Sequence, residues 1–416
     1  MADTRSWAEV TQVHRGFAGA GEVLLVFLKL GLTSFGGPIA HLGYFRQEFV
    51  VRRQWLADRA YSDLVALCQF LPGPASSKVG IAIGTSRAGL LGGLAAWIGF
   101  TMPSALALIA FGYGVTSFAG LSESGIVHGL KVAAVAVVAQ AVWGMAKNLC
   151  PDAKRASLAV FSALLVLAWP TASGQIAAIL ICGLVGKWTM TDAPAAPHAP
   201  HGFGVSKMTG VVASVLFFGL LAGLPVVSRS FPNHALAVFD SFYRSGSLVF
   251  GGGHVVLPLL RAEVVPPGWV TDNVFLAGYG AAQAVPGPLF TFSAYLGTVM
   301  TQPPNGWVGG MLCLVGIFLP CFLLAIGPLP FWEALRGHHA IQSALRGINA
   351  AVVGLLLAAL YDPVWTSAVK SRADFGLALA AFTLLMFWKV SPVIVVAFAA
   401  AGGWLLASGL SLSGLF

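Results

Sequence analysis

Two Pro-Gly-Pro triplets are the residues of this 416-residue chain whose types and spacing are best suited to chemistry. Each follows a glutamine in strongly apolar sequence. They are Gln69, Pro72, Gly73 and Pro74 in the first half of the chain, and Gln283, Pro286, Gly287 and Pro288 in the second. Proline removes a backbone donor and glycine loosens a helix, so a triplet at membrane depth must line a cavity or be buried in protein. A half-helix that begins after such a break directs free N–H groups and its positive dipole end at an anion.

The residues that follow the two triplets differ between the halves. Ser76, Ser77 and Lys78 offer two hydroxyls and a cation, whereas Thr291 is the polar residue of the matching stretch. We therefore expect the first half to carry more of the anion-binding polarity. Two alternatives stay open. The breaks are kinks required for packing, or the glutamines cap freed carbonyl groups instead of bonding to a substrate, since a buried amide must find partners.

Two cations occupy matching positions on apolar segments, Lys29 in the first half and Arg244 in the second. A cation inside a membrane segment costs at least ~2.5–3.5 kcal/mol unless it is paired or hydrated. One hypothesis is that both attract a multivalent anion into a central cavity, so that replacing Lys29 by alanine abolishes transport. The alternative is structural pairing with Glu22 and Asp240, which lie on the same helices.

A Phe-Gly-Gly sequence follows each of these cations by six residues. The glycines are Gly36 and Gly37 in the first half and Gly251 and Gly252 in the second. Small residues let membrane helices approach closely, which is one interpretation of these pairs. The other is that they line the path of the substrate.

The elements that position these residues are membrane helices. Hydrophobic residues make up 57% of the chain and charged residues 9%, with a mean hydropathy of +0.83, whereas soluble domains carry about 25% charged residues. Apolar stretches recur at lengths suited to crossing a bilayer, about 11–13 segments in all. The composition therefore predicts an all-α polytopic membrane protein with helices broken at the Pro-Gly-Pro triplets.

Several functional classes lack support in the sequence. The net charge of +8 comes without a Lys/Arg-rich run, so it predicts membrane orientation and not nucleic-acid binding. Five cysteines without a C-x-x-C pair predict neither a disulfide set nor a metal site. A phosphate-binding G-x-x-x-x-G-K-[ST] loop is absent, so we predict neither ATP use nor any catalytic residue, cofactor or enzymatic activity.

An internal duplication extends well beyond the two motifs. Five pairs of sequence segments recur in the same order at a nearly constant offset: 29–31 with 244–246, 46–48 with 261–263, Trp55 with Trp269, 101–103 with 318–320, and 128–131 with 346–349. We therefore predict two homologous helical-bundle halves. The first domain spans 1–190 and the second 228–416, separated by a polar linker at 191–207 and an additional apolar segment at 208–227.

Loop charges favour an inverted relation between the halves. Basic residues gather between the first and second segments of the first half, but between the third and fourth segments of the second half. Because cytoplasmic loops are enriched in Lys and Arg, this exchange of sides indicates inverted repeats. Two explanations of the crossing parity stay open. Either the Pro-Gly-Pro segment is re-entrant, or one charged loop departs from the charge rule. If all segments cross, the odd segment at 208–227 itself inverts the second half.

These motifs together resemble the chromate transporter (CHR) family in its long-chain, two-domain form. The resemblance rests on residues 32–41, 52–56 and 71–74 in the first half and on 250–254 and 285–288 in the second. It implies a multi-pass carrier of the bacterial inner membrane that exports chromate and confers chromate resistance, with sulfate as a related oxyanion. The second half departs from the first by having Gly253 where the first has Pro38.

Charge considerations agree with export of such an ion. Chromate near neutral pH is largely a dianion, and one charge crossing 100 mV is worth about 2.3 kcal/mol, so outward movement of two negative charges gains about 4.6 kcal/mol. The membrane potential or an ion gradient then drives export. A carrier of sulfate or another oxyanion and an anion channel are the alternatives. The expected partners are the solute and the lipid bilayer, and whether the chain forms a homo-oligomer stays open.

Overall fold

The computed structural model describes residues 17–35, 37–117, 124–190, 205–250, 253–331 and 338–408. Within these ranges the chain folds into helices joined by loops, and no strand occurs. The helices before the predicted linker are α2 (Phe17–Thr33), α3 (Gly37–Arg46), η1 (Gln47–Arg52), α4 (Asp58–Phe70), α5 (Ala75–Ser117), α6 (Gly125–Leu149), α7 (Ala153–Ala168) and α8 (Ala172–Thr189). Most of the linker, 191–204, lies outside the described residues.

A separate long helix, α9 (Lys207–Ser230), then leads into a second series of helices. These are α10 (His234–Ser247), η3 (Gly253–Val255), α11 (Val256–Val264), α12 (Asp272–Ala282), η4 (Leu289–Thr291), α13 (Phe292–Val299), α14 (Gly306–Ile326), η5 (Leu329–Phe331), α16 (His339–Ala359), η6 (Leu360–Trp365), α17 (Thr366–Ala368), α18 (Arg372–Met386) and α19 (Pro392–Ala407).

The two series follow the same plan. Helices α2, α3 and α4 correspond to α10, α11 and α12, and α6, α7 and α8 correspond to α16, α18 and α19. Helix α5 matches α13 and α14 together, because its backbone leaves helical geometry at Ala88 and Gly89, where Gly89 has a φ of +68°. The structure therefore confirms the predicted all-helical fold with two homologous halves.

Matching ion pairs close the same turn in each half. Arg46 Nε lies 2.7 Å from Asp58 Oδ1, between α3 and α4. Arg261 Nε lies 2.7 Å from Asp272 Oδ1, between α11 and α12. The internal repeat places Arg46 opposite Arg261, and both arginines hold equivalent helix hairpins together.

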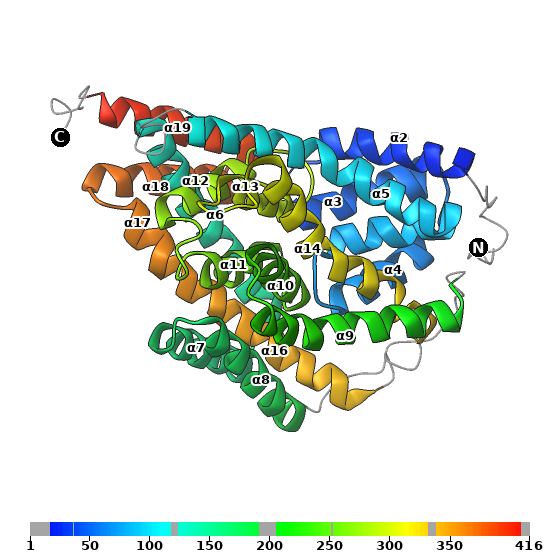
Figure 1. The fold of residues 1–416 in the computed structure, drawn as a ribbon. Helices are drawn as coiled ribbons and strands as arrows, with labels where there is room; N and C mark the ends of the chain where they lie inside the picture. Colours follow the sequence, from blue (N-terminus) through cyan, green and yellow to red (C-terminus); the bar gives the residue numbers. More distant parts are fainter. Residues whose placement is uncertain are drawn as a thin grey trace.

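The halves interlock through their last helix pairs. Helices α7 and α8 of the first half pack on α16 of the second, and α18 and α19 of the second pack on α6 of the first. Figure 1 shows α7, α8 and α16 side by side along the lower edge of the molecule. Glycine permits the contact on both sides: a Cβ on Gly129 would lie 2.1 Å from Ala399 O, and one on Gly347 would lie 1.9 Å from Cys182 O.

Six of the described helical stretches are long and apolar enough to cross a bilayer. They are 75–117, 125–149, 172–189, 207–230, 306–331 and 339–368, and two shorter apolar helices occur at 289–299 and 392–407. Helix α9 keeps little of its apolar surface inside the protein, with 17% of its span buried, so this surface suits lipid. The chain is thus a multi-pass membrane protein, while the total of about 11–13 segments stays a prediction.

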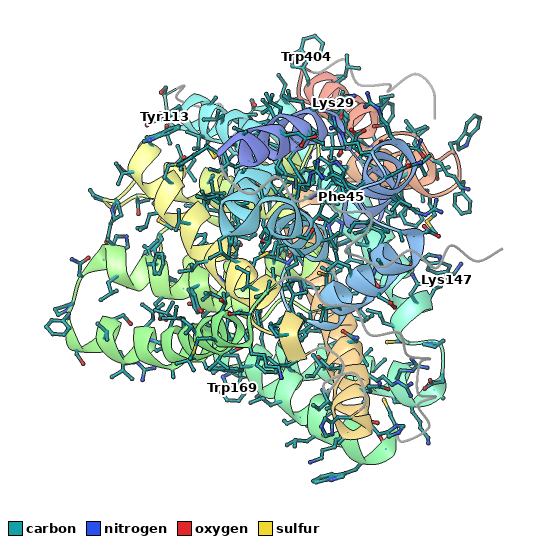
Figure 2. All side chains as sticks on the ribbon, turned by 90° about the vertical axis from the view of Figure 1, so that its right-hand side faces the viewer. Lys29, Phe45, Tyr113, Lys147, Trp169 and Trp404 are labelled. Atoms are coloured by element: carbon teal, nitrogen blue, oxygen red, sulfur yellow. The ribbon has the colours of Figure 1, made fainter. Side chains whose placement is uncertain are left out.

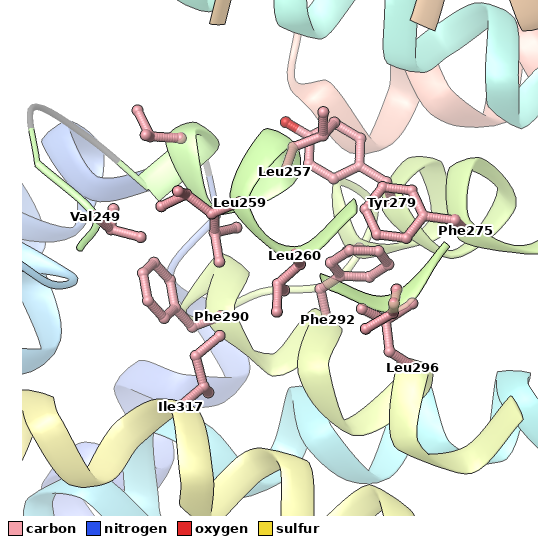
Figure 3. Packing of buried hydrophobic residues seen from close by; sticks show 14 of the residues in the cluster. Val249, Leu257, Leu259, Leu260, Phe275, Tyr279, Phe290, Phe292, Leu296 and Ile317 are labelled. Carbon is pink, nitrogen blue, oxygen red and sulfur yellow. The ribbon is translucent and has the colours of Figure 1, made fainter. Parts of the chain in front are cut away.

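The largest apolar core belongs mainly to the second half. Figure 3 shows part of it, including Val249, Phe290 and Ile317 of α14. A smaller core surrounds Phe27, Phe45, Phe49 and Phe100 in the first half, where the rings meet at centroid distances of 5.0–6.5 Å. Both cores pack around the helices that end at the Phe-Gly-Gly sequences.

Close backbone packing of α2 on α5 yields the first prediction. A Cβ on Gly31 would lie 2.5 Å from Gly99 O, so Gly31→Ala forces the two helices apart and costs about 1–3 kcal/mol. We expect the thermal unfolding midpoint of the detergent-purified protein to fall by several degrees. Gly21→Ala in the same helix is the control, because nothing lies within 4 Å of a Cβ there. Equal midpoints for the two variants would contradict the packing.

Candidate functional site

Each Pro-Gly-Pro triplet contacts the opposite half of the molecule. The Gly73 N–H donates a hydrogen bond to Val249 O at 2.6 Å, and the Gly287 N–H donates one to Ser34 O at 2.9 Å. Ser34 and Val249 both come directly before the phenylalanine of a Phe-Gly-Gly sequence. Each triplet therefore donates to the carbonyl left free where the first helix of the other half ends. We call this exchange of hydrogen bonds between the halves the crossing of the triplets.

Glycine is required at the centre of both triplets. Gly73 and Gly287 adopt φ values of +96° and +90°, in the left-handed region that other residues disfavour. A Cβ on Gly287 would also lie 3.0 Å from both Phe100 O and Ser104 Oγ. Helix α4 ends at Phe70 and α5 begins at Ala75, so residues 71–74 run outside any helix.

The polar residues that follow the triplets largely satisfy the backbone around them. Lys78 is fully buried, and its Nζ donates to Leu71 O at 2.5 Å and Pro72 O at 2.8 Å. Thr291 Oγ1 donates to Pro288 O at 2.8 Å. Lys78 thus supplies hydrogen bonds to the carbonyl groups that end α4.

The two predicted glutamines occupy different environments. Gln69 is exposed, whereas Gln283 is partly buried, with its Nε2 at 3.5 Å from Tyr279 O within its own helix. Gly37 opens α3 with a φ of +78° and has nothing within 4 Å of a Cβ, so this glycine is explained by its conformation. Gly36, Gly251 and Gly252 lie outside the described residues.

Buried polar side chains of the first half gather where the second triplet docks. We call them the hydroxyl cluster: Ser34, His41, Ser76, Ser77, Thr101 and Ser104. All six are at most 3% exposed. His41 Nδ1 lies 3.4 Å from Ser76 Oγ, and the His41 ring stands edge-on to Phe100 at 5.2 Å between centroids. Ser104 Oγ donates to Thr101 O at 3.0 Å and also faces Gly287.

The corresponding positions of the second half are mostly apolar. The repeat offset places Val249, Val256, Phe290, Thr291, Phe318 and Cys321 opposite Ser34, His41, Ser76, Ser77, Thr101 and Ser104, in that order. Of these six, Thr291 alone carries a hydroxyl, which is already bonded to Pro288. The predicted inequality of the halves is therefore present in the buried side chains, and it is wider than the sequence analysis stated.

Arg244 is held by two carboxylates. Its Nη2 lies 3.2 Å from Asp240 Oδ2 and 2.9 Å from Glu263 Oε2. This geometry matches the structural-pairing alternative, with Glu263 as a further partner that sequence spacing did not indicate.

Glu22 pairs with arginines and not with Lys29. It lies 3.3 Å from Arg53 Nη1 and 3.3 Å from Arg87 Nη2. Arg53 also pairs with Glu48 at 2.7 Å, and Arg53 and Arg87 both approach the ring of Trp55. Burial favours the neutral form of Glu48, but hydrogen bonds from Arg53 and Arg52 outweigh it and hold the pKa of this carboxyl below its usual value.

Lys29 lies on the outer face of α2. Its neighbours along that face, Leu25 and Leu32, are 68% and 56% exposed. Figure 2 labels Lys29 on this helix, and its side chain is exposed. The structure therefore separates the two matching cations: Arg244 is paired and partly buried, while Lys29 shares a stripe with leucines that suit lipid.

Sequence reasoning missed four members of the hydroxyl cluster: Ser34, His41, Thr101 and Ser104. A signal was available, because Ser34 and His41 flank the first Phe-Gly-Gly and Thr101 lies in one of the repeated segments. An alignment of the two halves would have shown that hydroxyl residues of the first half correspond to Val and Phe in the second. The convergence of α2, α3 and α5 on one point is a property of the fold.

Comparison with known proteins decides the family. The family model described as "Chromate transporter" matches residues 21–187 and 236–404, which covers both halves. This chain belongs to the chromate transporter family. The family match also confirms the prediction of a transport protein in place of an enzyme.

Curated relatives match over almost their whole length. The chain is 28% identical to a chromate transport protein of Pseudomonas aeruginosa over 395 residues, which covers 91% of each chain. It is also 28% identical to a chromate transport protein of Cupriavidus metallidurans, covering 92% of each. A probable chromate transport protein of Synechococcus elongatus is 27% identical over 90% of this chain and 93% of the relative. No solved structure matches.

The crossing of the triplets yields the second prediction. Gly287→Ala adds a Cβ that strains a positive φ and also meets Phe100 O and Ser104 Oγ. Gly268→Ala is the matched control, since its φ is +76° with nothing within 4 Å. Strain alone costs about 1–2 kcal/mol in both variants. We expect the unfolding midpoint to fall further for Gly287→Ala, and similar midpoints would argue against a tight crossing.

The unequal cations yield the third prediction. Arg244→Ala leaves two carboxylates without their guanidinium, which costs about 3–5 kcal/mol for a buried pair. We expect this variant to be poorly stable and inactive. Lys29→Ala removes an exposed charge and should retain most of the transport rate, contrary to the expectation from sequence. Both variants are tested by oxyanion flux in vesicles that contain matched amounts of protein. Complete loss of flux in Lys29→Ala would show that Lys29 acts on the substrate after all.

Proposed function

We propose that this protein is a secondary carrier that exports chromate across the bacterial inner membrane and thereby confers chromate resistance. The observation that carries the proposal is the crossing of the two triplets beside a buried set of hydroxyl and imidazole groups. Such groups solvate an oxyanion after it leaves water. The names of the relatives in Pseudomonas and Cupriavidus support chromate as the solute.

The substrate path runs through the crossing. The backbone of both triplets and both Phe-Gly-Gly sequences lines it, together with the side chains that follow each triplet. The residues proposed to line it are Gly36, Gly37, Pro72, Gly73, Pro74, Ser76, Ser77, Lys78, Gly251, Gly252, Gln283, Pro286, Gly287, Pro288 and Thr291. The pairing of Arg244 and the exposure of Gln69 remove these two from the set expected from sequence. Irregular backbone is tolerated in a membrane where it is buried in protein or lines a cavity, which supports this placement.

Alternating access moves one layer of helices against another. The interlocked pairs on α6 and α16 form the fixed part, because each of them joins both halves. The helices around the two triplets form the moving part, and inverted halves would give it two equivalent end states. Ser34 and Thr101 are completely buried in this state. A buried site of this kind supports a carrier over an open channel.

The membrane potential supplies the driving force. Moving two negative charges out through 100 mV gains about 4.6 kcal/mol, from about 2.3 kcal/mol per charge. The family resemblance and the lack of an ATP-binding loop agree with this source of energy. A gradient of another ion remains the alternative, and its signature is a dependence on pH or on a second solute.

The fourth prediction concerns the flux itself. Purified protein in proteoliposomes should move labelled chromate at a rate that rises when a potassium gradient drives dianions outward. A pH gradient imposed at zero potential should change the rate little. Protein-free liposomes are the control, and excess sulfate tests the competing solute. A flux that does not respond to the potential but follows the pH gradient would show that the pH gradient, and not the membrane potential, drives transport. Single-channel currents in a planar bilayer would show that the protein is a channel and not a carrier.

A further inference from the structure

Four buried polar atoms of the hydroxyl cluster have no hydrogen-bond partner. They are Ser34 Oγ, His41 Nε2, Ser77 Oγ and Thr101 Oγ1. An unsatisfied buried group costs about 1–3 kcal/mol, and native proteins contain few of them. Twelve such atoms occur among the described residues, and four of them belong to this one cluster. This concentration gives the four atoms the character of ligand-binding groups.

The fold brings most of the residues that carry these atoms close together. Ser34 follows the end of α2, His41 lies on α3, and Ser77 and Thr101 lie on the two parts of α5. The Gly287 N–H bonds to Ser34 O, and Ser104 Oγ, facing Gly287, bonds to Thr101 O. His41 Nδ1 contacts Ser76 Oγ, and the Nε2 atom of the same ring has no protein partner.

The cluster offers donors without a formal charge. Lys78, on the same helix as Ser77, uses two of its three N–H donors on the carbonyls of Leu71 and Pro72. Arg87 is held by Glu22 and Trp55, and Lys29 faces outward. The described members of the cluster include no carboxylate either. Preorganised hydroxyl and imidazole dipoles stabilise an anion strongly in a water-excluded site, because they need no reorganisation when the ion arrives.

Donors without a carboxylate acceptor select a particular ligand. In chromate and sulfate dianions all four oxygens accept hydrogen bonds, so every donor finds a partner. Hydrogen phosphate carries a proton that needs an acceptor, and it would turn one hydroxyl away from donation. A site that leaves a buried polar group unpaired discriminates against the ligand that causes it.

The second half lacks this arrangement. Val249, Val256, Phe290 and Phe318 occupy the positions of Ser34, His41, Ser76 and Thr101, and Figure 3 shows Val249 and Phe290 within the apolar core. Two other buried hydroxyls of that half, Ser245 and Ser293, also lack partners. Their equivalents in the repeat are the apolar Leu30 and Val79, so they have no counterpart in the cluster.

We propose that the hydroxyl cluster is the one oxyanion site among the residues that the structure describes, that it binds fully deprotonated tetrahedral dianions through uncharged donors, and that it prefers chromate and sulfate over phosphate. The second half contributes the Gly287 loop that closes the site, and its described residues hold no second site. This inference rests on the proposed function for its solute, but the site itself is tested by binding alone.

The experiment is isothermal titration calorimetry of the full chain in lipid nanodiscs, with sodium sulfate, chromate and phosphate as the probes. We expect one site per chain and at least tenfold weaker binding of phosphate at neutral pH. Ser34→Ala, Thr101→Val and His41→Phe should each raise the Kd for sulfate roughly tenfold or more, as expected for a lost hydrogen bond to a charged ligand. Thr101→Ser keeps the hydroxyl and should bind nearly as the parent does.

Matched controls separate binding from folding. Ser245→Ala and Ser293→Ala remove buried, unpartnered hydroxyls of the second half and should leave the Kd within about twofold, less than the factor expected for a lost hydrogen bond. Unfolding midpoints are measured for every variant. Two sites per chain, equal affinity for phosphate, or an unchanged Kd in folded Ser34→Ala and Thr101→Val would overturn the inference.

The proposed function fails by a different result. If sulfate binds with the expected pattern but neither vesicle orientation moves chromate, the site stands and the export function is wrong. If chromate moves at the parent rate in Ser34→Ala and Thr101→Val, and their Kd is unchanged, the function stands and this site is wrong.

Discussion

Two backbone hydrogen bonds, exchanged between the halves, set the arrangement of the whole centre of this protein. A helix that ends inside a membrane leaves carbonyl groups that water cannot reach, and each such group costs several kcal/mol if it stays unpaired. Here the carbonyls of Ser34 and Val249 receive the N–H groups of Gly287 and Gly73. Each break is thus satisfied by the break of the other half, so each interruption contributes to the stability of the other.

The duplicated halves have the same backbone arrangement and differ in their side chains. Matching ion pairs, Arg46 with Asp58 and Arg261 with Asp272, hold equivalent hairpins. Glycines at equivalent positions let α2 approach α5 and α10 approach α14. Polar side chains at the crossing are concentrated in the first half, where Ser34, His41 and Thr101 stand opposite valine and phenylalanine. Divergence has therefore acted on the side chains while the packing that joins the helices stayed the same.

The charges within the apolar segments mostly serve the structure. Lys78 bonds to the carbonyls that end α4, and Arg244 holds two carboxylates. A buried charge needs partners before it becomes affordable, and a cation with protein partners has less of its field left for a solute. Neutral donors avoid this conflict, because a hydroxyl costs less to bury and gives its whole dipole to the ligand.

The sequence by itself determined the membrane class, the helical fold, the duplication and the importance of the two triplets. Those features depend on composition, on hydrophobic segment length and on residues whose backbone effects are local, such as Pro72 and Gly287. Tertiary structure decided the partners. Spacing along α2 suggested Lys29 for Glu22, but Arg53 and Arg87 arrive from elsewhere in the chain and take that carboxylate.

The crossing of the triplets was likewise outside the reach of one-dimensional reasoning. Gly73 and Val249 are far apart in the sequence, and their contact exists because interlocked helix pairs bring the halves together. The same holds for the hydroxyl cluster, whose members come from three helices and acquire a common role through packing alone. Local chemistry fixes which elements form, whereas contacts between distant segments fix which side chains meet.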